Sequence, residues 1–180
     1  MIPGTRLLLV RHAMPHIEPD VPAEHWHLGA EGLTAARRLA PRIPANAYLV
    51  ASTEPKAQET LRQVTTASPV RADSSFAEVR RPHEWSDPDV YRATAQAYVQ
   101  GAPMDGWERH ADAVARFDAG VAHHAGLAFP AGQTLVIGTH GLAVTLWLAS
   151  RFPLRPGYFW ARLRLPDLID VDLSTGTVKV

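Results

Sequence analysis

The chain of 180 residues contains no cysteine, which excludes a disulfide framework, a thiolate nucleophile and a cysteine-based zinc site. It also lacks an excess of charge, because 18 lysines and arginines balance 18 aspartates and glutamates. A balanced chain has no general attraction for nucleic acid or for an anionic membrane. We therefore expect no nucleic-acid partner, and we expect any anion site to be local.

Long hydrophobic runs are absent as well. No segment approaches the roughly 20 apolar residues that a membrane-spanning helix needs. The apolar run in MIPGTRLLLV is too short for a secretory signal. We expect a soluble, cytoplasmic protein with no membrane partner.

Lysine is scarce, since Lys56 and Lys179 are the only lysines among the 18 basic residues. Three common motifs are missing too: the phosphate loop GxxxxGK[ST], the dinucleotide fingerprint GxGxxG and the hydrolase elbow GxSxG. The sequence therefore does not support a P-loop enzyme, a dinucleotide-binding enzyme or a serine hydrolase.

What the sequence does contain is an alternation of short apolar runs with longer helix-periodic stretches, the pattern of βαβ units. Strands are predicted over residues 5–10, 48–51 and 134–137. Helices are predicted over residues 31–40, 88–100, 107–125 and 141–152, and a further helix is predicted to start at a cap formed by Ser52 or Thr53. The tail predicts antiparallel edge strands over residues 158–165, 169–173 and 177–180. We expect residues 1–180 to form a single α/β domain, with a mostly parallel central sheet flanked by helices on both faces.

Polar side chains follow each of the three predicted parallel strands. Arg11 and His12 follow the first, Lys56 comes shortly after the second, and His140 follows the third. The carboxyl ends of parallel strands meet at one edge of a sheet, where ligands bind next to helix N-termini. The sequence therefore predicts a phosphate site at this edge, covered by the irregular residues 14–29.

Four segments resemble the signature boxes of the histidine phosphatase superfamily, the phosphoglycerate-mutase-like group, and its small phosphatase branch. LLLVRHAMP looks like the RHG or RHA box and contains Arg11 and His12. ASTEPKAQET is similar to a second box, usually Ser-Ser-Pro-Leu-x-Arg-Ala-x-Gln-Thr, and places Lys56 where an arginine usually stands. SFAEVRRPHEW resembles the region of the acidic residue, with Glu78 at that place, and VIGTHG resembles the closing box, with His140. The boxes occur in family order.

The resemblance implies a phosphomonoester hydrolase that needs neither a metal nor a cofactor and acts on a small phosphorylated substrate. His12 is implied as the nucleophile that becomes a phosphohistidine, with its other ring nitrogen donating to a carbonyl or carboxylate. Arg11, Lys56 and His140 are implied as phosphate ligands, and His140 is also counted among the catalytic residues. Glu78 is the candidate general acid.

Two departures from the family pattern keep other functions open. Lysine cannot make the bidentate phosphate contact of an arginine, so Lys56 also suits a weak or inactive phosphate-binding regulatory module. AMPHIEPD, after the first box, lacks the Glu-Ser or Glu-Thr pair that mutase relatives usually carry, which makes a phosphoglycerate-type mutase less favoured.

Several further residues have more than one interpretation. Glu84 is the alternative general acid. Trp26, Trp85 and Trp107 are expected to be packing residues, of which one could line the pocket. Glu108 is expected to be a favourable acidic residue in the first turn of a helix. Arg80 and Arg81 either read an acidic substrate or are solvated. No pattern in the sequence indicates an oligomeric state.

Overall fold

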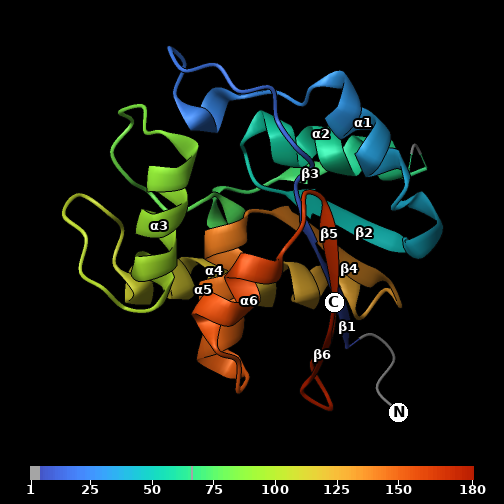
Figure 1. The fold of residues 1–180 in the computed structure, drawn as a ribbon. Coiled ribbons are helices and arrows are strands. Elements are labelled where there is room, and N and C mark those ends of the chain that lie inside the picture. Colours follow the sequence, from blue (N-terminus) through green and yellow to red (C-terminus); the bar gives the residue numbers. More distant parts are fainter. Residues whose placement is uncertain (1–4, 66) are drawn as a thin grey trace.

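The computed structural model describes residues 5–65 and 67–180, and its centre is a six-stranded sheet with the order β3-β2-β4-β1-β5-β6 (Figure 1). The strands are β1 (Arg6–Arg11), β2 (Ala47–Ala51), β3 (Arg71–Ala72), β4 (Thr134–Thr139), β5 (Asp167–Asp172) and β6 (Thr177–Lys179). Strands β1 to β4 run parallel, whereas β5 is antiparallel to β1 and β6 is antiparallel to β5. The predicted mostly parallel sheet with antiparallel strands near the C-terminus is confirmed.

Six α-helices surround the described sheet. They are α1 (Ala30–Arg37), α2 (Pro55–Val64), α3 (Pro88–Val99), α4 (His110–Ala128), α5 (Gly141–Arg151) and α6 (Pro156–Arg162). Three 3-10 turns accompany them, η1 (Ala23–His25), η2 (Ala40–Arg42) and η3 (Ser74–Phe76). Helices α1 and α2 lie on one side of the sheet, while α4, α5 and α6 lie on the other (Figure 1). In the described residues no helix is both long enough and apolar enough to cross a membrane.

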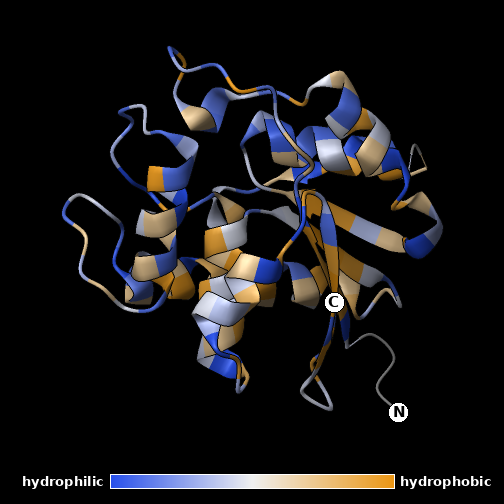
Figure 2. Ribbon diagram, in the orientation of Figure 1, coloured by the Kyte–Doolittle hydropathy of each residue, from blue (hydrophilic) through white to orange (hydrophobic). Residues whose placement is uncertain are grey.

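The side chains of β1 show how the sheet holds the two helical layers. Leu7 and Leu9 pack into a cluster with residues of α4 and α5, whereas Leu8 and Val10 pack into a cluster with residues of α2. Successive side chains of a strand point to opposite faces, so a run of four apolar residues serves both layers. Figure 2 shows this core as a hydrophobic sheet inside helices whose outer faces are hydrophilic.

The prediction of a strand over residues 158–165 is wrong. This segment contains most of α6, which starts at Pro156, and proline suits the first turn of a helix. Trp160 is buried in the cluster that joins α6 to α3 and α5. The apolar residues of this segment therefore follow a helical face, although their alternation in the sequence suggested a strand.

Two smaller features also differ from expectation. Strand β3 was not predicted, because two exposed residues, Arg71 and Ala72, carry no apolar signal. The N-cap of α2 is Glu54, where Ser52 or Thr53 was predicted, and its side chain makes no capping hydrogen bond. The Ser52 hydroxyl instead accepts a hydrogen bond from the Glu54 backbone N–H at 3.1 Å.

Candidate active site

The ends of β1, β4 and β2 lie side by side in the sheet, as the sequence predicted. The backbone N–H of His12 donates to the carbonyl of Thr139 at 3.0 Å, and that of Ser52 donates to the carbonyl of Gly138 at 2.8 Å. These hydrogen bonds continue the parallel ladders by one residue beyond the strands. The residues that follow the three strands therefore meet at one edge.

His12 is buried, and one of its ring nitrogens has a defined partner. Nδ1 lies 2.8 Å from the carbonyl oxygen of Ala13, an acceptor, so Nδ1 carries the proton and Nε2 keeps its lone pair. Burial holds the pKa of His12 well below its usual value, and the nearby His140 and Lys56 lower it further. The backbone N–H of Ala13 donates in turn to Thr60 Oγ1 at 3.0 Å, which fixes this turn against α2. His12 is therefore a neutral imidazole with a free Nε2.

His140 is completely buried, and its ring lies next to the ring of His12 with a centroid separation of 5.0 Å. Burial, followed by the positive charge of Lys56, lowers the pKa of His140 well below its usual value. Nε2 lies 2.9 Å from Ser52 Oγ, and Nδ1 has no hydrogen-bond partner among the described residues. Nδ1 is therefore the ring nitrogen of His140 that is left for a ligand.

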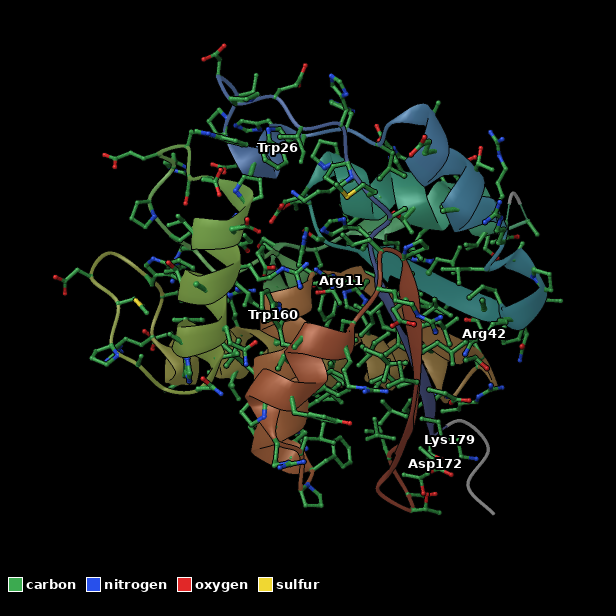
Figure 3. All side chains as sticks on the ribbon, viewed as in Figure 1. Arg11, Trp26, Arg42, Trp160, Asp172 and Lys179 are labelled. Atoms are coloured by element: carbon green, nitrogen blue, oxygen red, sulfur yellow. The ribbon has the colours of Figure 1, made fainter. Side chains whose placement is uncertain are left out.

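Arg11 is the last residue of β1 (Figure 3), and its guanidinium lies close to Gly141, the first residue of α5. One terminal nitrogen donates to the Leu163 carbonyl at 2.8 Å. A Cβ atom at Gly141 would lie 3.0 Å from Arg11 Nε, so a side chain at this glycine would press on the guanidinium. The glycine of the VIGTHG box thus allows Arg11 to reach the edge of the sheet.

Lys56 is buried at the start of α2 and forms an ion pair that the sequence did not reveal. Its Nζ donates to Glu54 Oε2 at 2.5 Å and to the carbonyl of Ala23 at 2.6 Å. An ammonium has three N–H groups, so one is left for a ligand. Glu54 Oε1 accepts from the backbone N–H of Glu78 at 2.8 Å and lies 3.4 Å from His140 Nε2.

Glu78 is held by the first turn of α5. Its Oε1 accepts from the N–H groups of Val79 and Ala143, both at 2.9 Å, and its Oε2 accepts from Leu142 N–H at 3.2 Å. The N-terminus of α5 was expected to contribute to a phosphate site, but two of its N–H groups bind this carboxylate. Oε2 accepts a single N–H, so it retains a lone pair that can carry a proton.

Arg116 of α4 holds the backbone around Glu78 in place through hydrogen bonds. Arg116 pairs with the buried Glu108 at 2.9 Å and also donates to the carbonyls of Ser75, Ala77 and Glu78. The prediction that Glu108 lies in the first turn of a helix is wrong, because α4 begins at His110. Burial raises the pKa of Glu108, but the hydrogen bonds and charges of Arg116 and Arg80 outweigh burial and lower this pKa overall, as expected for the buried anion of this network.

A cavity of about 590 Å³ lies over the edge of the sheet and contains all five predicted site residues. We call Arg11, His12, Lys56, Glu78 and His140 the floor of this cavity. Glu84, the alternative acid, lines the same cavity but is exposed. Trp26 and Trp85 line it as well, whereas Trp107 packs against Tyr98.

Sequence reasoning missed Glu54 and the support that Ser52 and Thr60 give to the two histidines. A signal for Glu54 was present, because it stands where the resembling phosphatases usually have a leucine, two residues before the unusual Lys56. Glu54 and Lys56 both depart from the usual residues and lie two positions apart, so the acidic residue can compensate the charge of the lysine. In the described part of the chain no group of three or more histidines, aspartates and glutamates is arranged to hold a metal ion.

The same arrangement of strands and helices occurs in solved structures of phosphatases. A mycobacterial glucosyl-3-phosphoglycerate phosphatase, solved with VO3, is 19% identical, with a TM-score of 0.71 over 97% of this chain and 96% of that one. A putative alpha-ribazole-5'-P phosphatase from Escherichia coli is 21% identical, with a TM-score of 0.68 over 98% of this chain and 95% of that one. No protein-family model matches the sequence, and no curated protein matches it significantly. At these identities the similarity establishes the shared fold.

Proposed function

We propose that the protein is a metal-independent phosphomonoester hydrolase that acts through a phosphohistidine on His12. The observation that carries the proposal is the state of this residue. A neutral imidazole, with Nδ1–H held by the Ala13 carbonyl, presents Nε2 to a cavity that also contains Arg11, Lys56 and His140. Nucleophile and anion ligands thus share one site.

The first step transfers the phosphoryl group to the enzyme. His12 Nε2 attacks phosphorus, a P–N bond forms, and the bond between phosphorus and the ester oxygen breaks. The leaving alkoxide takes a proton from Glu78, whose Oε2 has the lone pair to carry it. His12 becomes cationic as it is phosphorylated at Nε2, because Nδ1 retains its proton.

The second step returns the enzyme to its starting state. Water attacks the phosphohistidine and passes a proton to the Glu78 carboxylate, the P–N bond breaks, and inorganic phosphate leaves. Glu78 is then protonated for the next cycle, and His12 is again neutral. The two steps together consume only the ester and one water molecule.

The transferring phosphoryl group spreads negative charge over three oxygens, so fixed positive donors dominate its stabilisation. Arg11 offers the planar fork, Lys56 offers its remaining N–H, and His140 offers Nδ1. The Glu54–Lys56 pair supports a working site, because the ammonium is oriented by two acceptors and keeps one donor for phosphate.

The test is hydrolysis of a generic aryl phosphate in the presence of a chelator. We expect turnover that survives chelation and is lost in His12→Ala. A broad panel of phosphomonoesters without turnover, together with tight binding of inorganic phosphate, would instead identify the protein as a phosphate-binding regulatory module.

A further inference from the structure

The cavity is larger than a phosphate group requires, and its lining beyond the floor has a different character. A volume of about 590 Å³ falls in the range of pockets for small organic ligands. Beyond the floor, several apolar and aromatic side chains line it together with polar ones such as Thr53, Glu84 and Ser86. We call Met14, Ile17, Trp26, Trp85 and Tyr91 the apolar wall.

The wall keeps large apolar side chains in contact with water. Met14 is 43% exposed, Ile17 is 37% exposed and Trp85 is 48% exposed, and all three line this one cavity. Scattered exposed apolar residues are normal on a protein surface, but a group of them around a concave site indicates an apolar ligand.

Trp26 is fixed so that its ring serves as a surface. Its indole N–H donates to the carbonyls of Glu18 and Val21, at 3.1 and 2.9 Å, which leaves the ring faces for packing. The ring centroid lies 6.4 Å from that of Trp85 at an interplanar angle of 52°. In Figure 3, Trp26 lies on the loop that overhangs the edge of the sheet where Arg11 ends β1. The two indoles therefore form an angled wall along the way to the floor.

Two cations at the rim already have carboxylate partners. His83 lies 3.0 Å from Glu24 and Arg80 pairs with Glu108 at 3.1 Å, while the Arg81 guanidinium lies 5.0 Å from the centre of the Tyr91 ring. A ligand rich in carboxylate groups would have to compete with Glu24 and Glu108 for these cations, and it would meet the exposed carboxylate of Glu84.

From this arrangement we propose that the preferred substrates are phosphomonoesters of alcohols that carry an uncharged aromatic ring or an apolar group of similar size. The inference rests on the proposed function, since it assigns the floor to the phosphate and the apolar wall to the alcohol. Phosphosugars and phosphorylated hydroxy acids are disfavoured, because the wall offers them few unpaired polar groups.

The experiment compares phosphate esters of primary alcohols, so that the acidity of the leaving group stays nearly constant. The series runs through ethyl, butyl, hexyl and 2-phenylethyl phosphate, with glycerol 3-phosphate, glucose 6-phosphate and 3-phosphoglycerate as polar members. Burial of one methylene is worth about 0.8 kcal/mol, which is about fourfold in kcat/KM. We expect a rise of about two- to fourfold per methylene, and 2-phenylethyl phosphate to exceed glycerol 3-phosphate at least about tenfold.

Trp85→Ala provides the variant arm. We expect it to reduce the ratio of kcat/KM between 2-phenylethyl and ethyl phosphate by about three- to tenfold, and Trp85→Phe to restore much of that ratio. Leu127→Ala, at an exposed leucine outside the cavity lining, is the matched control and should leave the ratio unchanged.

A series without a trend from ethyl to hexyl, or a preference for any of the polar esters, would overturn the inference while leaving the phosphatase proposal intact. Binding of the non-hydrolysable 2-phenylethylphosphonate and ethylphosphonate, measured by calorimetry, separates the two proposals. If no ester turns over but the aromatic phosphonate binds more tightly, the phosphatase proposal fails and the inference about the ligand stands. Equal binding of the two phosphonates without turnover would overturn both.

Discussion

The floor and the apolar wall of the cavity are built in opposite ways. His12, Lys56 and His140 of the floor are buried at strand ends and helix starts, and other residues fix their polar atoms. The wall lies on residues 14–26 and 85–91, outside the sheet, and several of its side chains are exposed. The sheet thus fixes the groups that would meet the phosphoryl group, while the segments above it meet the rest of the ligand. Among esters of alcohols of similar acidity, changes in the floor should affect all members alike, and changes in the wall should affect them unequally.

After the loss of turnover expected in His12→Ala, the largest effect is expected from the acid. Glu78→Gln keeps an oxygen for the N–H groups of Val79 and Ala143, loses the acceptor of Leu142 N–H and cannot act as an acid, so hydrolysis of alkyl phosphates should fall by about 100-fold or more. An aryl phosphate with an acidic leaving group should be slowed much less. Equal slowing of both esters would show that Glu78 is not the acid.

Lys56→Ala should come next, with a loss of about 2 to 3 kcal/mol or roughly 30- to 150-fold in rate that is the same for every ester. This change also leaves the buried Glu54 without its cation, which destabilises the fold. The double variant Lys56→Met with Glu54→Gln separates the two effects, because it removes both charges but keeps an oxygen for the Glu78 N–H, so it should recover stability without recovering rate. A single variant whose rate stays within a factor of two, assayed where it is fully folded, would rule out Lys56 as a phosphate ligand.

The sequence could predict three residues of the floor because they are tied to features that are local in the chain, whereas Glu78 was identified through the resemblance alone. Arg11 and His12 directly follow a strand that is apolar on both faces, and His140 directly follows another. Parallel pairing then brings these ends together without further information.

The supporting contacts could not be predicted, because they join residues that are distant in the chain. Arg116 reaches the carbonyls around Glu78 from another helix, and Ser52 meets His140 across the sheet. The error at α6 has a related cause, since the burial of Trp160 depends on α3 and α5. The sequence indicated the apolar wall only weakly. Its signs were a long irregular segment and tryptophans that could serve either for packing or for lining the pocket.

A smaller effect concerns the stability of the floor. His12 and His140 have folded-state pKa values well below 6.5, so between those values and about pH 6.5 the unfolded chain binds protons that the folded chain does not. The free energy of unfolding should therefore fall as the pH is lowered from about 6.5, by up to about 1.4 kcal/mol per pH unit for each histidine. Above that range both states are neutral and these residues contribute no pH dependence.

His12→Asn checks this expectation by urea unfolding at pH 7 and at several lower values. The free energy of unfolding of the variant should depend less steeply on pH, by up to the contribution of one proton. The carboxylates titrate in both proteins, so their contribution cancels when the two slopes are compared. Identical slopes in the two proteins would contradict a neutral, buried His12.

The smallest effect is expected in the wall. Ile17 is partly exposed, so Ile17→Ala removes only part of an apolar contact, and kcat/KM for 2-phenylethyl phosphate should fall by about threefold. The same variant should change kcat/KM for ethyl phosphate less, and a uniform loss for both esters would erase the distinction between wall and floor.

The most direct test of the account is to trap the phosphorylated enzyme during turnover. Rapid quenching in alkali with a phosphorus-labelled ester, followed by peptide mapping, should find the label on the peptide that contains His12. The label should be stable in base and lost in acid, as a P–N bond requires, and it should be absent from His12→Asn. Label on a hydroxyl side chain, or steady turnover with no label on the protein at any time point, would contradict the proposed phosphohistidine.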